Sequence, residues 1–179
     1  MKFATSVIAL ALAFVALASP VERGIKPVQT AIMAISDQAD ALNSAIAVFK
    51  SSPSLNTVLT ITSDLASLVG TVAAATDSVT SSATFTKAQS ANVVSNTTAL
   101  ASHLDTALTS LQSQRSNFNA SPLVPSIATT EGSLSQLQSA FTGLGNALSA
   151  KIAKSSTLSL DETLDSISNV VTPTLNAFA

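Results

Sequence analysis

The side chains that could support acid–base or nucleophilic chemistry are few in this sequence of 179 residues. It contains one histidine, His103, with Asp105 two positions later, and Asp64 and Asp77 lie in an earlier segment. A hydrolase triad needs a serine that a histidine activates and a carboxylate that orients the histidine. No Gly-x-Ser-x-Gly elbow occurs in the sequence, and residues two apart on a helix point to different faces. We therefore expect His103 to be an ordinary surface residue and the protein not to be an enzyme.

Metal, cofactor and nucleic-acid sites are also not expected. The absence of cysteine excludes disulfides, thiolate zinc sites, iron–sulfur clusters and thiol nucleophiles, and one histidine with scattered carboxylates matches no metal-ligand spacing. Gly143-Leu144-Gly145 resembles half of a dinucleotide loop, but no strand pattern precedes it. Charged residues make up only 10% of the chain and the net charge is -2, which leaves no basic stripe for nucleic acid.

The elements that must position any site are predicted to be helices. Apolar residues recur at steps of three and four through most of the chain, which places them on one side of each helix. No alternating strand pattern competes, so we predict an all-α fold, an antiparallel bundle of about five amphipathic helices. The expected segments run over 25–49, 54–79, 84–117, 127–152 and 159–178.

Several residues are expected to begin, bend or end these segments. Ser159-Leu160-Asp161-Glu162 has the pattern of a capping box, so the fifth helix is predicted to open there. Gly70 predicts a bend or break in the second segment, and Pro173 predicts a kink or a frayed last turn in the fifth. Gly143 and Gly145 weaken the fourth segment, and they allow another helix or a ligand to approach closely.

The N-terminus has the pattern of a secretory signal. Lys2 is followed by an apolar run that ends in Ala16-Leu17-Ala18, an A-x-A cleavage site. The run is short for a membrane anchor, and polar residues follow it directly. We predict a signal peptide over 1–18 and a single helical-bundle domain over 19–179, and therefore a secreted protein. We expect it to be soluble because the C-terminus is too polar for a GPI signal.

Two sequons are candidate glycosylation sites in such a secreted chain. They are Asn96-Thr97-Thr98 and Asn119-Ala120-Ser121, and Pro122 makes the second a poorer acceptor. Neutral Ser, Thr, Ala, Asn and Gln occupy most outward positions. This composition fits either compositional drift in an O-glycosylated protein or a surface whose low charge lets the protein sit on waxy or lipidic material.

The apolar interior has two interpretations. A tightly packed core is the ordinary one, but a core rich in alanine and poor in large aromatic residues could also leave an elongated gap that suits a fatty-acyl chain. The candidate lipid-binding residues would line that gap from several helices. They are Ile32, Ile35, Leu42, Leu65, Leu68, Leu104, Leu111, Leu137, Phe141 and Leu144.

The chain resembles the fungal hydrophobic-surface-binding proteins and the related cell-wall galactomannoproteins. The resemblance rests on the signal peptide, the opening Ile25-Lys26-Pro27-Val28-Gln29-Thr30-Ala31-Ile32 with its helix running to Phe49, and the cysteine-free helices rich in Ser, Thr and Ala that follow. It covers about residues 20–178. The resemblance implies a secreted helical bundle that adsorbs to hydrophobic surfaces and recruits a polyester hydrolase there, or that carries a fatty acid inside the bundle.

Two functions are therefore expected, and they differ in whether a ligand is bound. The first is a non-catalytic protein that binds hydrophobic surfaces or a fatty-acid-like lipid. The alternative is a structural or antigenic glycoprotein of the cell wall or matrix without a specific ligand. Many relatives carry a Ser/Thr-rich stalk and a GPI tail that this sequence lacks, which argues against wall anchoring; the expected location is extracellular, either released or associated with the cell wall.

Overall fold

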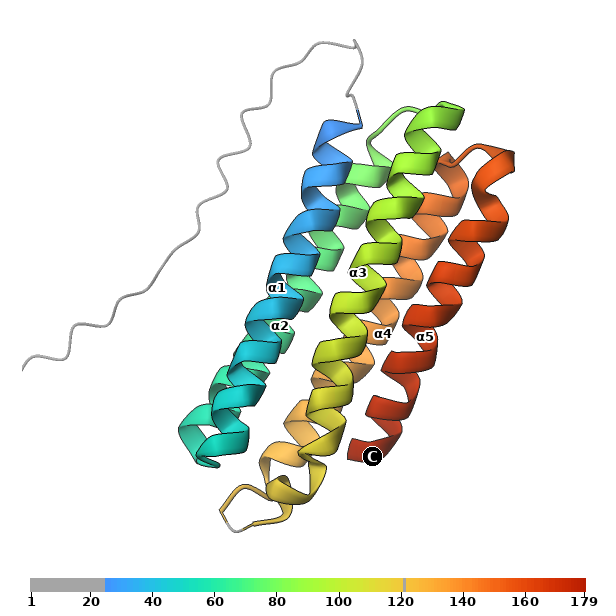
Figure 1. The fold of residues 1–179 in the computed structure, drawn as a ribbon. Helices are drawn as coiled ribbons and strands as arrows, with labels where there is room; N and C mark the ends of the chain where they lie inside the picture. Colours follow the sequence, from blue (N-terminus) through green and yellow to red (C-terminus); the bar gives the residue numbers. More distant parts are fainter. Residues whose placement is uncertain (1–24, 121) are drawn as a thin grey trace, which may run out of the picture.

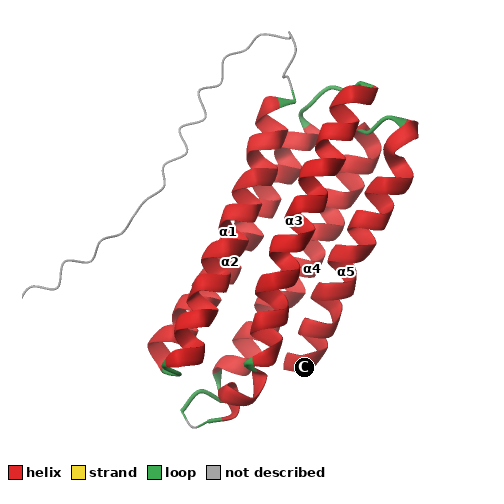
Figure 2. Cartoon of the chain, viewed as in Figure 1, coloured by secondary structure: helices red, strands yellow, loops and turns green. Residues whose placement is uncertain are grey.

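The structure, a computed structural model, describes residues 25–120 and 122–179. Within these ranges the chain forms long helices joined by short turns and no strand (Figures 1 and 2). The all-α prediction is confirmed, and the predicted signal peptide lies outside the described residues. The five long helices are α1 (Lys26–Ser51), α2 (Leu55–Thr80), α3 (Lys87–Ser113), α4 (Ser126–Lys151) and α5 (Thr157–Phe178), and the short 3-10 helices are η1 (Arg115–Asn119) and η2 (Lys154–Ser156).

Two of the long helices begin at capping boxes. Ser54 accepts the N–H of Thr57 on its side chain, and the Thr57 hydroxyl oxygen in turn accepts the N–H of Ser54. Thr86 and Gln89 form the same reciprocal pair at the start of α3. Each pair satisfies backbone N–H groups that have no partner within the helix.

The predicted capping box at Ser159 is wrong. The helix already begins at Thr157, after the 3-10 turn η2, and its N-cap residue makes no side-chain cap. Ser159 lies inside the first turn, where its carbonyl accepts the hydroxyl of Thr163. Because Ser159 is already helical, it cannot be the N-cap residue that a capping box requires.

Other expectations about the helix ends are settled only for one of their alternatives. α2 continues through Gly70 without a break, and α5 continues past Pro173 to Phe178 without a frayed last turn; a bend at Gly70 and a kink at Pro173 stay predictions. The third segment is shorter than 84–117, because α3 ends at Ser113 and η1 follows it as a separate 3-10 turn.

The helices pack in two layers. α1, α3 and α5 form one layer and run in the same direction, and α2 and α4 lie behind them and run the opposite way (Figure 1). Neighbouring pairs in contact are α1–α2, α2–α4, α4–α5, α5–α3 and α3–α1. The contacts therefore close into a ring of five helices, whose apolar sides face a common interior.

Candidate functional site

The interior of the ring is the candidate site, and all ten predicted lipid-binding residues lie in it. They are buried and belong to one continuous hydrophobic core. α1 supplies Ile32, Ile35 and Leu42, α2 supplies Leu65 and Leu68, and α3 supplies Leu104 and Leu111, while Leu137, Phe141 and Leu144 come from α4. None comes from α5, which completes the ring on the remaining side.

Two grooves flank α5, one on each side. The groove between α4 and α5 has a volume of about 360 Å³, within the roughly 300–1,000 Å³ typical of small-molecule sites. The groove between α3 and α5 has a volume of about 540 Å³. Of the five neighbouring helix pairs, α4–α5 packs least extensively. α5 therefore has the least extensive contacts with the rest of the bundle.

The α4–α5 groove has an apolar floor. Phe141, Leu164, Ile167 and Val171 line it, and Gln138, Asn146, Asp161 and other polar residues line its rim. Phe141 alone among the ten predicted residues reaches this groove, so the other nine lie deeper in the core. Leu164, Ile167 and Val171 were predicted as part of an apolar helix side but not as site residues.

Gly145 brings α4 and α5 close together beside this groove. A Cβ atom at this position would lie 3.0 Å from Cδ1 of Leu164, whereas a Cβ at Gly143 would meet no atom within 4 Å. The close approach expected from the two glycines is thus confirmed at Gly145. Gln138 Nε2 donates to Thr172 Oγ1 at 3.0 Å and links the same two helices further along.

Aromatic packing closes one end of the bundle. Phe118 of η1 lies between Phe49 and Phe178, with ring centroids 4.8 and 5.1 Å away, and all three rings are fully buried. The Arg115 guanidinium lies 5.5 Å from the centre of the Phe178 ring, and its Nε donates to the carbonyl of Ala177 at 2.7 Å. This end is therefore fixed by packing and by a hydrogen bond to the last turn of α5.

The opposite end is closed by the turn between α2 and α3. The N–H of Phe85 donates to the carbonyl of Lys151 at 2.8 Å, and Lys151 Nζ donates to the carbonyl of Ser82 at 2.7 Å. Ser90 accepts the N–H of Ala153 on its hydroxyl at 2.9 Å. Because both ends are closed in this way, the grooves on the two sides of α5 are the remaining routes to the interior.

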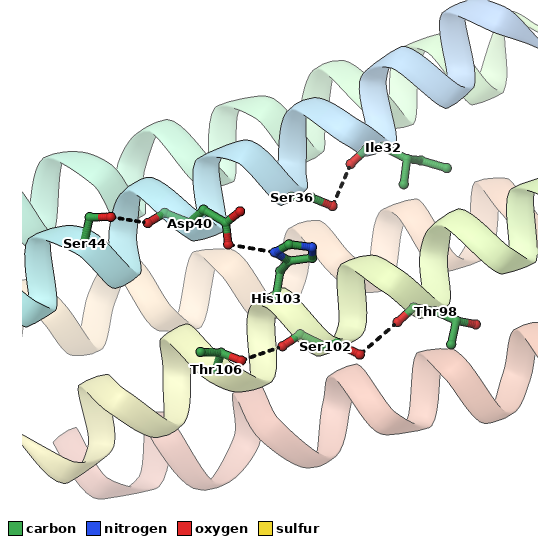
Figure 3. A network of polar contacts seen from close by, with 8 residues as sticks. All are labelled: Ile32, Ser36, Asp40, Ser44, Thr98, Ser102, His103 and Thr106. Carbon is green, nitrogen blue, oxygen red and sulfur yellow. Dashed lines mark hydrogen bonds and ion pairs between the residues drawn. The ribbon is translucent and has the colours of Figure 1, made fainter.

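His103 lies outside the interior, on the surface between α1 and α3. Its Nδ1 lies 2.7 Å from Oδ1 of Asp40 (Figure 3), and both side chains are about half exposed. Asp105 takes no part, as expected from its position on the helix. Within 25–120 and 122–179, no group of three or more His, Cys, Asp or Glu side chains could hold a metal ion.

Asp64 of α2 is the carboxylate that burial affects. Burial raises the pKa of Asp64 above its ordinary value of 3.8.

The two sequons lie in different surroundings. Asn96 is half-buried within α3, and the hydroxyl of Thr98 in its sequon donates to the carbonyl of Val94. Asn119 is exposed at the end of η1, where its side-chain oxygen accepts from Arg115 Nη1 at 2.6 Å. A glycan at either asparagine remains a prediction.

Comparison with known proteins agrees with this architecture. Residues 25–150 match the family described as hydrophobic surface binding protein A (HsbA). The chain belongs to the HsbA family. The family match spans α1 to α4, and the resemblance inferred from the sequence is thereby confirmed for HsbA. A comparison with curated protein sequences finds no match.

Solved structures share the fold of this HsbA-family chain. The crystal structure of Afmp4p in complex with palmitic acid has a TM-score of 0.80 at 15% identity, over 87% of this chain and 100% of that one. Ligand binding domain 2 of Penicillium marneffei MP1, complexed with multiple arachidonic acids, has a TM-score of 0.76 at 19% identity, over 89% and 98%. Domain 1 of the same protein, with arachidonic acids, has a TM-score of 0.77 at 11% identity, over 87% and 99%.

Proposed function

We propose that this HsbA-family protein is a secreted, non-catalytic binder that carries a long-chain fatty acid in the interior of its bundle and adsorbs to hydrophobic surfaces. One observation carries the carrier function: a continuous apolar interior is enclosed by five helices, of which α5 has the least extensive contacts and is flanked by grooves. Structures with this fold have been solved with palmitic and arachidonic acids bound, which supports the choice of ligand.

The interior must open to admit an acyl chain, because the ten predicted lining residues are closely packed in this structure. Their exposed fractions range from 0% to 5%. Each methylene that moves from water into the core contributes about 0.8 kcal/mol, so an acyl chain can offset the loss of some helix–helix contacts. We propose that α5 shifts away from α3 and α4 and that the ligand enters along Phe141.

A tryptophan reporter tests this function directly, since the chain contains no tryptophan or tyrosine. In Phe141→Trp the indole would lie where the groove meets the core, and palmitate should shift its emission with a saturable, stoichiometric dependence. The control is Leu158→Trp, because Leu158 is 78% exposed and should report no change. Native mass spectrometry of the unmodified protein with palmitate gives the mass of the complex, and a protein that takes up no palmitate in either assay would contradict the carrier function.

The close packing also favours a second candidate function, a structural or antigenic wall or matrix glycoprotein without a ligand. It predicts adsorption to wax or plastic together with the absence of palmitate uptake. Recruitment of a secreted polyester hydrolase is a further part of the proposal that rests on the family resemblance. It predicts that hydrolysis of polyester particles speeds up when they are first coated with this protein.

A further inference from the structure

Charged side chains are distributed unevenly between the two helix layers. The layer of α1, α3 and α5 carries Lys26, Asp37, Asp40, Lys50, Lys87, His103, Asp105, Asp161, Glu162 and Asp165. The layer of α2 and α4 carries Asp64, Asp77, Glu131 and Lys151. The α2–α4 layer therefore carries fewer ionisable groups, four over two helices against ten over three.

The four charged residues of the α2–α4 layer add little exposed charge to its outer face. Asp64, Glu131 and Lys151 are half-buried, and Lys151 is bonded to the carbonyl of Ser82 at the end of the bundle. Only Asp77 is exposed, and it lies in the last turn of α2. From Leu55 to Ala74 the outer side of α2 thus presents no exposed charge.

The outer side of α2 instead carries uncharged residues, with apolar side chains interleaved with the exposed polar residues Asn56, Thr60, Ser63 and Ser67. Leu55 and Leu59 are 49% and 57% exposed, and Ala66, Gly70 and Ala73 continue the same exposed ridge. We call these five residues the α2 face. An 18-residue window of this helix has a mean hydropathy of 1.6, although only 33% of it is buried; by length and composition alone α2 is apolar enough to cross a membrane.

Three hydroxyl groups beside the α2 face are bonded to the helix itself, whereas the exposed side chains of Asn56, Ser63 and Ser67 make no such bond. Thr60, Thr71 and Ser78 donate to the carbonyls four residues earlier, at 3.1, 2.8 and 3.0 Å. Removing water from this surface therefore leaves these donors satisfied, which avoids the cost of about 1–3 kcal/mol for each unpaired group.

The low relief of the α2 face indicates what kind of partner it meets. Protein partners usually bind through aromatic or arginine side chains that fill pockets, and the α2 face has neither. Its leucine, alanine and glycine residues form an uncharged ridge with short side chains, about 27 Å long between Leu55 and Ala73 at 1.5 Å for each residue. Such a ridge matches an extended uncharged surface, where no ion on either side has to be desolvated.

From these observations we infer that the α2 face is the surface through which the protein adsorbs to uncharged apolar solids such as wax or aliphatic polyester. This inference rests on the adsorption part of the proposed function and is independent of the fatty-acid site in the interior. The layer of α1, α3 and α5 then faces the water, and its charged side chains stay hydrated.

Matched lysine variants test the assignment. The test variant combines Leu59→Lys, Ala66→Lys and Ala73→Lys, and the control combines Leu158→Lys, Ala91→Lys and Ala99→Lys on the opposite layer. Both replace one exposed leucine and two exposed alanines within helices. Both add the same charge, and lysine is a good helix former. Adsorption is measured on an octadecyl-coated quartz crystal microbalance, with circular dichroism and palmitate binding as checks on the fold.

We expect the control variant to adsorb like the unmodified protein and the test variant to adsorb at least tenfold less at equal concentration, with both binding palmitate equally. Equal adsorption of all three proteins, or an equal loss in the two variants, would overturn the assignment to the α2 face and leave the adsorption function standing. Failure of the unmodified protein to adsorb would instead overturn that function. A dimer in solution that the test variant abolishes would identify a second copy as the occupant and overturn the inference as well.

Discussion

Thr98 of α3 and Thr163 of α5 face each other across one seam of the bundle, with their Oγ1 atoms 3.1 Å apart. Each hydroxyl also lies within hydrogen-bond distance of a carbonyl of its own helix, Val94 for Thr98 and Ser159 for Thr163, and its single hydrogen is donated to one acceptor at a time. The side chains are thus held in place at the junction where α5 would separate from α3. A covalent link between these two positions would therefore prevent α5 from separating from α3.

A disulfide at this contact should prevent ligand uptake. In the double variant Thr98→Cys and Thr163→Cys, the two sulfur atoms would occupy positions close enough to join at about 2.05 Å after a small adjustment, and the chain has no other cysteine. We expect the oxidised protein to take up palmitate at least tenfold more slowly than its reduced form. Stopped-flow displacement of a fluorescent fatty acid measures both rates, and the reduced form is the matched control.

Oxidation of the same variant should also stabilise the fold. The bridge would close a loop of roughly 65 residues, for which the chain-entropy relation gives about 4 kcal/mol. Chemical denaturation of the oxidised and reduced forms measures this difference. If the oxidised protein is more stable but takes up palmitate as fast as the reduced form, α5 does not have to leave α3 and another route admits the ligand.

Alanine substitutions at the two neighbouring glycines of α4 should have different effects. Gly143→Ala is expected to increase the free energy of unfolding by about 0.5–1 kcal/mol, because alanine favours the helix and the new Cβ meets no atom within 4 Å. Gly145→Ala should gain less or lose stability, because its Cβ would lie 3.0 and 3.3 Å from the two Cδ atoms of Leu164. Urea denaturation of both variants measures the contrast, and an equal gain at the two positions would show that Leu164 gives way freely.

Asp64 should make the stability of the bundle depend on pH. Burial raises its pKa in the folded state above the ordinary value of 3.8, so the unfolded chain releases this proton more readily than the folded one. The ionised carboxylate therefore destabilises the fold at neutral pH, and this penalty disappears as the pH falls through the folded pKa to below 3.8. We expect Asp64→Asn to be more stable than the unmodified protein at pH 7 and to lose that advantage near pH 3.

Exposed Asp77 on the same helix provides the control for this pH dependence. Asp77→Asn removes the same charge at an exposed position of the same helix, so it controls for the loss of a carboxylate at a site where no burial is relieved. Urea denaturation at both pH values separates the two cases. A pH-independent gain in Asp64→Asn would mean that the amide, and not the lost charge, stabilises the helix.

The helices could be predicted from the sequence because the apolar spacing of each segment depends only on its own residues. The ten interior positions were found for the same reason, since stripe residues such as Leu65 and Leu104 must be buried in any bundle. The grooves beside α5 could not be predicted in this way. Whether Leu164 faces α4 or another helix depends on the order of helices around the ring. The apolar spacing within one helix does not predict that order.

Contacts between distant residues were missed for the same reason. His103 was expected on the surface and lies there, but nothing near it in the sequence indicates its partner Asp40, 63 positions away. The capping-box pattern at Ser159 failed for a local reason, because Thr157 and Leu158 extend the helix before that serine. A short motif is therefore a weaker guide to a helix boundary than the apolar period is to the helix itself.

The aromatic cluster at the end of the bundle should be a larger source of stability than any surface contact. Phe118 is fully buried between Phe49 and Phe178, and truncating such a side chain leaves a cavity, so Phe118→Ala should cost about 3–5 kcal/mol. His103→Gln at the exposed pair with Asp40 should cost less than about 1 kcal/mol. Denaturant titration of the two variants measures this contrast.

Phe118→Leu separates the loss of packed volume from the loss of the aromatic contacts. Leucine keeps the site apolar and fills much of the space, so we expect it to recover more than half of the stability lost in Phe118→Ala. A leucine variant as unstable as the alanine variant would mean that the ring contacts with Phe49 and Phe178, and not the filled volume, hold this end of the bundle together. Since α5 ends in this cluster, the cavity in the alanine variant should loosen the C-terminal end of α5 and let palmitate enter faster than in the unmodified protein, and the displacement assay measures that rate.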